Sequence, residues 1–153
     1  VRFDAAYSSD LQRAIHTAEF IQRRHTQSGD LKTPEQLQQF REQFFGFFEG
    51  LPSAQSAEQI AGIIGLENIE SYGDLMAQLT QDEVMDAFKE ADPTHDAEDA
   101  ATFWARADKG LDILRRNVRD GQNVLVVAHG TLIRNLVYKY DSHEPAKTQP
   151  LYG

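Results

Sequence analysis

A histidine-glycine pair stands where a run of valines ends and a helical pattern begins. Residues 124–127 are too few for a buried helix and rich in β-branched side chains, which predicts a fully buried, parallel strand. Gly130 allows a sharp turn, Thr131 can cap, and apolar residues recur at helical spacing up to Lys139. His129 is therefore predicted at the carboxyl end of a strand, beside a helix N-terminus whose N–H groups attract anions. This position suits phosphate chemistry; a turn histidine bonded to backbone is the alternative.

A second group of interest is the carboxyl group of Glu42, which stands in an unusually aromatic stretch. Phenylalanine occupies five of the nine positions in residues 40–48. Aromatic side chains at this density favour packing into a core. Such packing would place the carboxyl group of Glu42 beside apolar surface.

The remaining histidines and the acidic residues show no metal-binding pattern. His16 follows Arg13 by three positions on a predicted helix and is interpreted as a surface or supporting residue. The other histidines lie in polar contexts without a partner at ligand spacing: His25, His95 and His143. An acidic cluster lacks the glycine and the spacing of a calcium loop and is interpreted as solvated surface: Asp92, Asp96, Glu98 and Asp99. No metal is expected.

The elements that must position these residues alternate between strands and helices. The predicted order is a strand at 3–7, a helix at 11–24, a short helix from Thr33-Pro34 to about Phe40, helices at 54–66, 72–79 and 81–91, a longer helix up to Asp120-Gly121, the strand at 124–127 and a last helix. A capping box, Thr80-Gln81-Asp82-Glu83, begins one of them. This order predicts an α/β fold with a largely parallel sheet. Two strands cannot form a stable sheet, so others must be hidden within residues 40–45 or absent from the chain.

Composition narrows the functional classes. The chain has 153 residues, of which 41% are hydrophobic, and this suffices for one domain with a real core. A formal charge of −9 argues against nucleic-acid binding, which needs a basic face. No apolar run reaches the length of a membrane span, and no cysteine is present. A cytoplasmic location is therefore the default expectation.

Three stretches together resemble one known family. They are Ser-Ser-Asp-Leu-Gln-Arg-Ala-Ile-His-Thr-Ala (8–18), Phe-Arg-Glu-Gln-Phe-Phe-Gly-Phe-Phe-Glu-Gly (40–50) and Val-Val-Ala-His-Gly-Thr-Leu-Ile-Arg (126–134). In this order and at these separations they are similar to the motifs of the histidine phosphatase superfamily, the phosphoglycerate mutase-like proteins. The resemblance covers nearly the whole chain and implies a three-layer α/β/α fold with a mostly parallel central sheet.

The resemblance also implies roles for individual residues. Arg13 falls on the family's phosphate-binding arginine, a role that suits the bidentate hydrogen bonds of a guanidinium group; an exposed helix arginine is the alternative. His129 falls on the second active-site histidine, which contacts the transferred phosphoryl group. Glu42 falls on the proton donor to the leaving oxygen. Gly130 is expected to add its backbone N–H to the substrate contacts. The family uses no metal, and no cofactor is implied.

One family motif does not occur in the chain. The nucleophile of the family is a histidine in an Arg-His-Gly motif at the end of its first strand, and Arg24-His25 is followed by Thr26 instead. In the family this strand precedes the segment that starts here at Phe3, and a final strand follows the region where the chain stops. The sequence is therefore expected to be a fragment, incomplete at both ends, whose nucleophile lies outside it.

The functional expectation follows from the resemblance. We expect a single histidine-phosphatase-like domain over residues 1–153, with about 51–99 forming a helical lid. The aromatic segment after Glu42 looks more like the phosphatases, which hydrolyse small phosphate monoesters through a phosphohistidine intermediate. Phosphoglycerate mutase activity is the enzymatic alternative, and a non-catalytic domain that binds phosphorylated ligands or a partner is the alternative of another class. A small phosphorylated substrate is the expected partner, and a homodimer is left open.

Overall fold

The structure is a computed structural model that describes residues 2–25 and 33–141, so His143 lies outside the described part. The chain divides into two compact units, one from Val1–Glu42 with Arg106–Gly153 and the other from Gln43–Ala105. The second unit contains the region predicted as a helical lid. The lid and the single-domain assignment stay predictions.

A small parallel sheet forms the centre of the first unit. Within the described residues it contains β1 (Ala5–Ser8), β2 (Glu35–Gln36) and β3 (Val124–Val127), in the order β2-β1-β3. Ala5 pairs with Val124 and Ser8 with Val127, so β1 and β3 run side by side over their whole length. The predicted α/β fold with a parallel sheet is confirmed.

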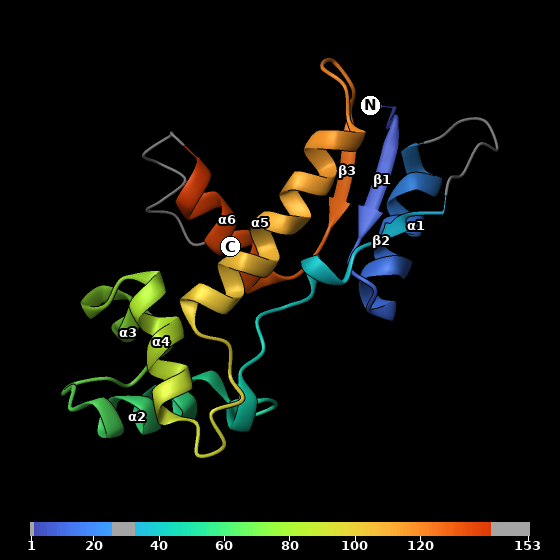
Figure 1. The fold of residues 1–153 in the computed structure, drawn as a ribbon. Coiled ribbons are helices and arrows are strands. Elements are labelled where there is room, and N and C mark those ends of the chain that lie inside the picture. Colours follow the sequence, from blue (N-terminus) through green and yellow to red (C-terminus); the bar gives the residue numbers. More distant parts are fainter. Residues whose placement is uncertain (1, 26–32, 142–153) are drawn as a thin grey trace. The chain divides into compact units, whose positions relative to one another are not determined.

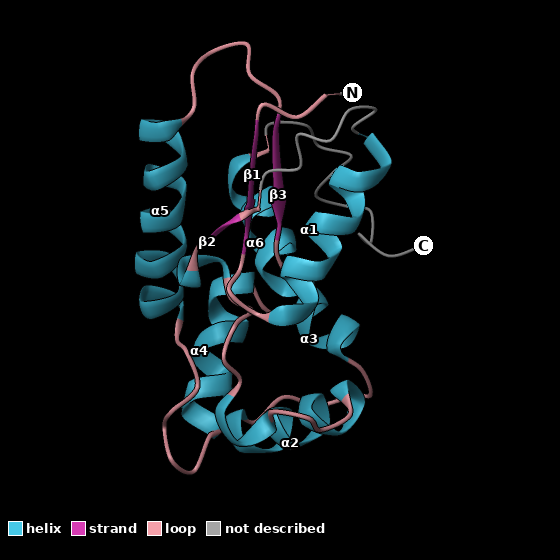
Figure 2. Cartoon of the chain, turned by 90° about the vertical axis from the view of Figure 1, so that its right-hand side faces the viewer, coloured by secondary structure: helices cyan, strands magenta, loops and turns pink. Residues whose placement is uncertain are grey.

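Helices cover both faces of this sheet. Figures 1 and 2 show α1 (Gln12–His25) on one face, and α6 (Gly130–Tyr140) on the other together with the part of α5 (Ala100–Asn117) that belongs to this unit. Tyr140 Oη donates a hydrogen bond to Asp108 Oδ1, which joins α6 to α5. The apolar face of α1 is buried through Ala14, Ile15 and Ala18. The first unit thus has the three layers that were predicted.

The third strand lies where a helix was predicted. Residues 35 and 36 form β2, beside Tyr7 and Ser8 of β1, and only residues 38–40 turn as a 3₁₀ helix, η1 (Gln38–Phe40). The backbone N–H of Leu37 donates to the carbonyl of Ser8 at 2.8 Å. Pairing with β1 satisfies backbone groups that an isolated helix start would leave to solvent, and it overrides the local capping signal. Residues 40–45, where a hidden strand was suggested, contain no strand.

The prediction that β3 is fully buried was wrong. Val126 is 39% exposed, and the other three residues of the strand are half-buried. In the described part of the chain β3 lies at the edge of the sheet, because it pairs with β1 on one side and is the last strand in the order β2-β1-β3. Hydrophobicity indicated the strand correctly, whereas its burial depends on what lies beyond that edge.

The second unit is helical. It contains η2 (Gly46–Phe48), α2 (Ser53–Ile64), α3 (Tyr72–Gln78), α4 (Gln81–Ala91) and the start of α5. Its core is formed largely by Phe48, Ile60, Leu75, Val84 and Phe88. The predicted capping box is confirmed, since Glu83 N–H donates to Thr80 Oγ1 and Thr80 N–H donates to the Glu83 carboxylate. No helix within residues 2–25 and 33–141 has both the length and the apolar character needed to cross a membrane.

The phenylalanine segment packs only in part. The ring of Phe48 meets Phe88 edge-on at a centroid distance of 5.5 Å, and Phe45 contacts the same ring at 5.0 Å. By contrast, Phe44 and Phe47 are 47% and 56% exposed. The density of aromatic residues therefore indicated a core for some of these side chains and not for all.

Asp92 does not belong to the solvated surface to which it was assigned. It is fully buried, and its carboxylate accepts hydrogen bonds from the backbone N–H groups of Thr94, Asp96 and Ala97. A Cβ atom at Gly46, where φ is +56°, would lie 1.9 Å from Asp92 Oδ2. The glycine of the Phe-Gly motif is therefore required both by its backbone angle and by this close approach.

Candidate functional site

The candidate site lies at the carboxyl ends of β1 and β3. Ser9 directly follows β1, and His129 follows β3 after a single residue. The backbone N–H of Ser9 donates to the carbonyl of Val127 at 3.0 Å, which extends the pairing of the two strands by one step. The parallel register therefore brings the loop before α1 next to the histidine.

His129 is held by two side chains. It is the N-cap residue of α6 and only 7% exposed. Its Nε2 lies 2.7 Å from Oγ of the fully buried Ser9. The Nε of Arg13, an exposed residue of α1, lies 3.3 Å from Nδ1 of the same ring. Two of the three predicted catalytic residues are thus in contact.

The surroundings of His129 favour the neutral ring. Burial lowers the pKa of His129 below its ordinary value of 6.5, and the positive charges of Arg13 and Arg106 lower it further, while Glu42 and Asp10 act in the opposite direction. The shift is downward, so the imidazole is uncharged at neutral pH.

Glu42 binds the first turn of α6. Its Oε2 accepts a hydrogen bond from the backbone N–H of Thr131 at 3.0 Å, and its Oε1 from that of Leu132 at 2.9 Å. The prediction that Thr131 caps this helix was wrong, because the N-cap residue is His129 and a distant carboxylate binds the N–H groups. A carboxylate suits the positive end of the helix dipole.

Gly130 is the first residue of α6. The N–H groups of a first helical turn have no partner within the helix. At this position the N–H of Gly130 belongs to the same set of donors as those of Thr131 and Leu132. Its proposed contact with substrate stays a prediction.

Arg106 holds the backbone of the segment that carries Glu42. Its Nη1 donates to the carbonyls of Gln39 and Arg41 at 2.8 and 2.9 Å, and its Nη2 lies 3.4 Å from the carbonyl of Glu42. Arg106 was not among the predicted site residues. A usable signal was present, because Arg106 occupies the same helical stripe as the buried residues Phe103, Ala107 and Gly110.

A second arginine ties the same segment to the loop after β1. Arg41 Nε donates to Asp10 Oδ1 at 2.7 Å, and its Nη2 donates to Oδ2. The hydrogen bonds and the charge of Arg41 lower the pKa of Asp10 below its ordinary value of 3.8. The hydroxyl of Ser9 also has a long contact with the backbone N–H of Leu11, at 3.4 Å.

The structure therefore brings the predicted residues together within the first unit. Arg13 and His129 are in direct contact, and Glu42 is bound to the helix that begins at His129. His16, His25 and His95 are exposed, as their polar contexts indicated. Among the described residues, no group of three or more His, Asp or Glu side chains could hold a metal ion.

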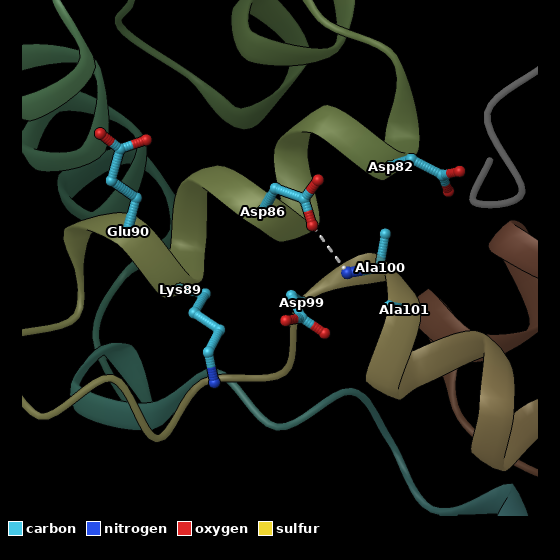
Figure 3. Close-up of a pocket in the computed structure, with 7 residues that line it drawn as sticks. All are labelled: Asp82, Asp86, Lys89, Glu90, Asp99, Ala100 and Ala101. Carbon is cyan, nitrogen blue, oxygen red and sulfur yellow. Dashed lines mark hydrogen bonds between the residues drawn. The ribbon is translucent and has the colours of Figure 1, made fainter.

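A separate pocket in the second unit has the wrong charge for a phosphate ester. It measures about 580 Å³ and is lined by Asp82, Asp86, Lys89, Glu90, Asp99, Ala100 and Ala101. Figure 3 shows four carboxylates and one lysine among the lining residues, and Asp86 accepts a hydrogen bond from the backbone N–H of Ala100 at 2.9 Å. Such a lining repels anions.

Comparisons with known proteins agree with the motifs. The crystal structure of the phosphoglycerate mutase from Bacillus anthracis str. Sterne matches with a TM-score of 0.80 and 34% identity, over 93% of this chain and 61% of that one. The alpha-ribazole phosphatase from Shigella flexneri matches with a TM-score of 0.54 and 23% identity, over 96% of this chain and 60% of that one, which shows the fold alone. The chain thus spans about three fifths of the length of both proteins.

A search of curated proteins gave no match. A family model, described as "Histidine phosphatase superfamily (branch 1)", matches residues 1–151. That match extends over almost the entire sequence and includes the strands, α1 and the segment that carries Glu42. The chain belongs to the histidine phosphatase superfamily, branch 1.

Proposed function

We propose that the full-length protein is a phosphatase that hydrolyses small phosphate monoesters through a phosphohistidine intermediate. The nucleophile is a histidine outside the 153 residues, because no Arg-His-Gly motif occurs within them. The observation that carries the proposal is the contact between Arg13 Nε and His129 Nδ1 at the carboxyl ends of two parallel strands. Ligands of α/β folds bind at this edge.

In this proposal each residue has a distinct task. The guanidinium of Arg13 binds phosphoryl oxygens through charge-assisted hydrogen bonds. His129 donates a hydrogen bond to the phosphoryl group and stabilises the charge that it carries during transfer. The backbone N–H of Gly130 adds a donor from the start of α6.

Glu42 is the proposed acid that protonates the leaving oxygen. Each of its carboxylate oxygens already accepts one backbone N–H from α6. A carboxylate offers about four lone-pair sites, so these two bonds leave a site that can hold the proton that passes to the leaving oxygen. The bonds also fix the carboxyl group at the helix N-terminus beside His129.

A phosphoglycerate mutase is the second candidate. The solved relative at 34% identity is a phosphoglycerate mutase, and its match favours this activity. The aromatic segment after Glu42 favours the phosphatase. The substrate and the acceptor of the phosphoryl group distinguish the two, since a mutase returns the group to the sugar acid and a phosphatase transfers it to water.

The test is turnover by the full-length protein. We expect release of p-nitrophenol from p-nitrophenyl phosphate, and inorganic phosphate rather than an isomer from 3-phosphoglycerate. Arg13→Ala and His129→Ala should each lower the rate by about a hundredfold, the scale of one lost transition-state charge contact. Isomer formation would favour the mutase. Phosphate binding without any turnover, together with the absence of Arg-His-Gly upstream of Val1 in the reading frame, would favour a non-catalytic domain.

A further inference from the structure

Ser9 is a buried residue in contact with His129 and has no role in the proposed chemistry so far. It lies just after β1, is fully buried, and its Oγ is 2.7 Å from His129 Nε2. Its backbone is fixed by the hydrogen bond to Val127 of β3. The hydroxyl therefore contacts the histidine from a rigid part of the sheet.

The contacts of the ring determine where its proton resides. The Nε of Arg13 can only donate, so Nδ1 of His129, at 3.3 Å, must accept. A neutral imidazole carries one proton, which then resides on Nε2. This N–H donates a hydrogen bond to Ser9 Oγ. The reverse tautomer would set two N–H donors, on Arg13 Nε and His129 Nδ1, against each other.

We propose that Ser9 is a positioning residue that holds the proton of His129 on Nε2 and so presents Nδ1, next to Arg13, to the phosphoryl group. The proposal rests on the proposed function for the identity of the ligand. A phosphoryl oxygen needs donors, so Nδ1 takes up a proton from solvent when the ligand binds. Nε2 keeps its own proton throughout, and the Ser9 hydroxyl accepts the hydrogen bond from this N–H in both states of the ring.

The charges around the ring allow this uptake of a proton. Arg13 of α1 and Arg106 of α5 oppose a charged ring, whereas Glu42 and Asp10 favour it. A phosphoryl group that binds to Arg13 would compensate one of the opposing charges and add negative charge beside Nδ1. Ligand binding and protonation of His129 should therefore strengthen each other.

The chain offers a matched control in the neighbouring residue. Ser8 is also fully buried, but among the described residues its Oγ has no hydrogen-bond partner. Ser8→Ala removes the same atom as Ser9→Ala from the same strand end without touching His129. Ser9→Thr retains the hydroxyl and serves as the rescue variant.

The experiment is ¹⁵N spectroscopy of the histidine rings in the full-length protein, with the His129 signals assigned from His129→Gln. At pH 7.5 the wild type and Ser8→Ala should show the Nε2–H tautomer, and Ser9→Ala a mixture with Nδ1–H. Titration with inorganic phosphate should convert the wild-type ring to the doubly protonated form. Ser9→Ala should bind phosphate about fivefold more weakly, as expected for one lost hydrogen bond, and protonate at lower pH. Ser9→Thr should restore the wild-type spectrum.

The outcomes separate this proposal from the proposed function. A wild-type ring in the Nδ1–H form, or an unchanged tautomer in folded Ser9→Ala, overturns the role of Ser9 whatever the enzyme does. An equal effect of Ser8→Ala also overturns it, because the effect would then arise from packing. The expected spectra in a protein without turnover would support the role of Ser9 and contradict the phosphatase.

Discussion

The carboxylate of Glu42 accepts a hydrogen bond from the backbone N–H of Thr131, a residue 89 positions further along the chain, at 3.0 Å. Together with the bond from Leu132, this makes Glu42, which lies two residues beyond η1, the N-terminal cap of α6. The proposed acid and the proposed phosphate-binding histidine are therefore fixed to the same helix end. A change in either should affect both stability and catalysis.

Glu42→Gln should destabilise the protein by about 1 kcal/mol, because it removes a negative charge and one acceptor from a helix N-terminus. Thr131→Ala is the control, since the Thr131 side chain does not provide the cap; it should change stability by less than about 0.5 kcal/mol. Urea unfolding measures both. Equal losses in the two variants would contradict the assignment of the cap to Glu42 alone.

The lowered pKa of His129 predicts a dependence of stability on pH. The unfolded state binds a proton below about pH 6.5, whereas the folded state binds it only at lower pH, so stability falls as pH decreases through this window. His129→Gln should reduce the slope of unfolding free energy against pH between 7 and 5. An unchanged slope in His129→Gln would show that the ring is not desolvated.

Arg106→Ala should destabilise the first unit by about 1–3 kcal/mol, because carbonyl groups of Gln39 and Arg41 lose their donors. Arg106→Lys should retain only part of the stability that Arg106→Ala loses, since an ammonium cannot reproduce the forked hydrogen bonds of a guanidinium. Arg115, 63% exposed and paired with Asp112, is the control, and its change to Ala should cost less than about 0.5 kcal/mol. Thermal unfolding compares them, and equal shifts for the two arginines would contradict the role of Arg106.

Asp92→Asn should destabilise the second unit by about 2 kcal/mol or more, because an amide cannot accept all the hydrogen bonds of the buried carboxylate. Burial alone would raise the pKa of Asp92, but hydrogen bonds from Thr94, Asp96 and Ala97 hold it at about 2. The stability that it contributes is present above about pH 4 and is lost as pH falls towards 2.

Asp96→Asn, in the same loop, is the control for Asp92→Asn, and it should lose far less stability than that variant. Denaturant unfolding at pH 7 and pH 3 distinguishes them. The difference between wild type and Asp92→Asn should shrink at the lower pH. A difference that stays constant between the two pH values would show that the charge of Asp92 contributes nothing.

Features with a local cause could be predicted from the sequence. The strand at Val124–Val127 and the box at Thr80 depend on residues next to one another, and both appear at the predicted positions. β2 could not be found in this way, because two residues become a strand only through pairing with β1. A similar reason applies to Asp92, because its carboxylate lies close to Gly46, a residue far from it in the sequence.

The residues of the candidate site also differ in whether the sequence could reveal them. Arg13, Glu42 and His129 were predicted because they stand in motifs that resemble those of the histidine phosphatase superfamily. The contacts of Ser9 and Arg106 span 120 and more than 60 positions. The helical stripe of α5 indicates that Arg106 faces inward, but no local pattern identifies the partners of either residue. Their roles follow from the hydrogen bonds of the folded chain.

The central claim is that Arg13 and His129 form one phosphate site, and a double-mutant cycle tests it most directly. The measurement is kcat/KM of the full-length protein for p-nitrophenyl phosphate in Arg13→Ala, His129→Ala and the double variant. Residues that act as a unit give non-additive losses, so the double variant should be hardly slower than the slower single variant. A loss equal to the product of the two single losses would contradict the claim.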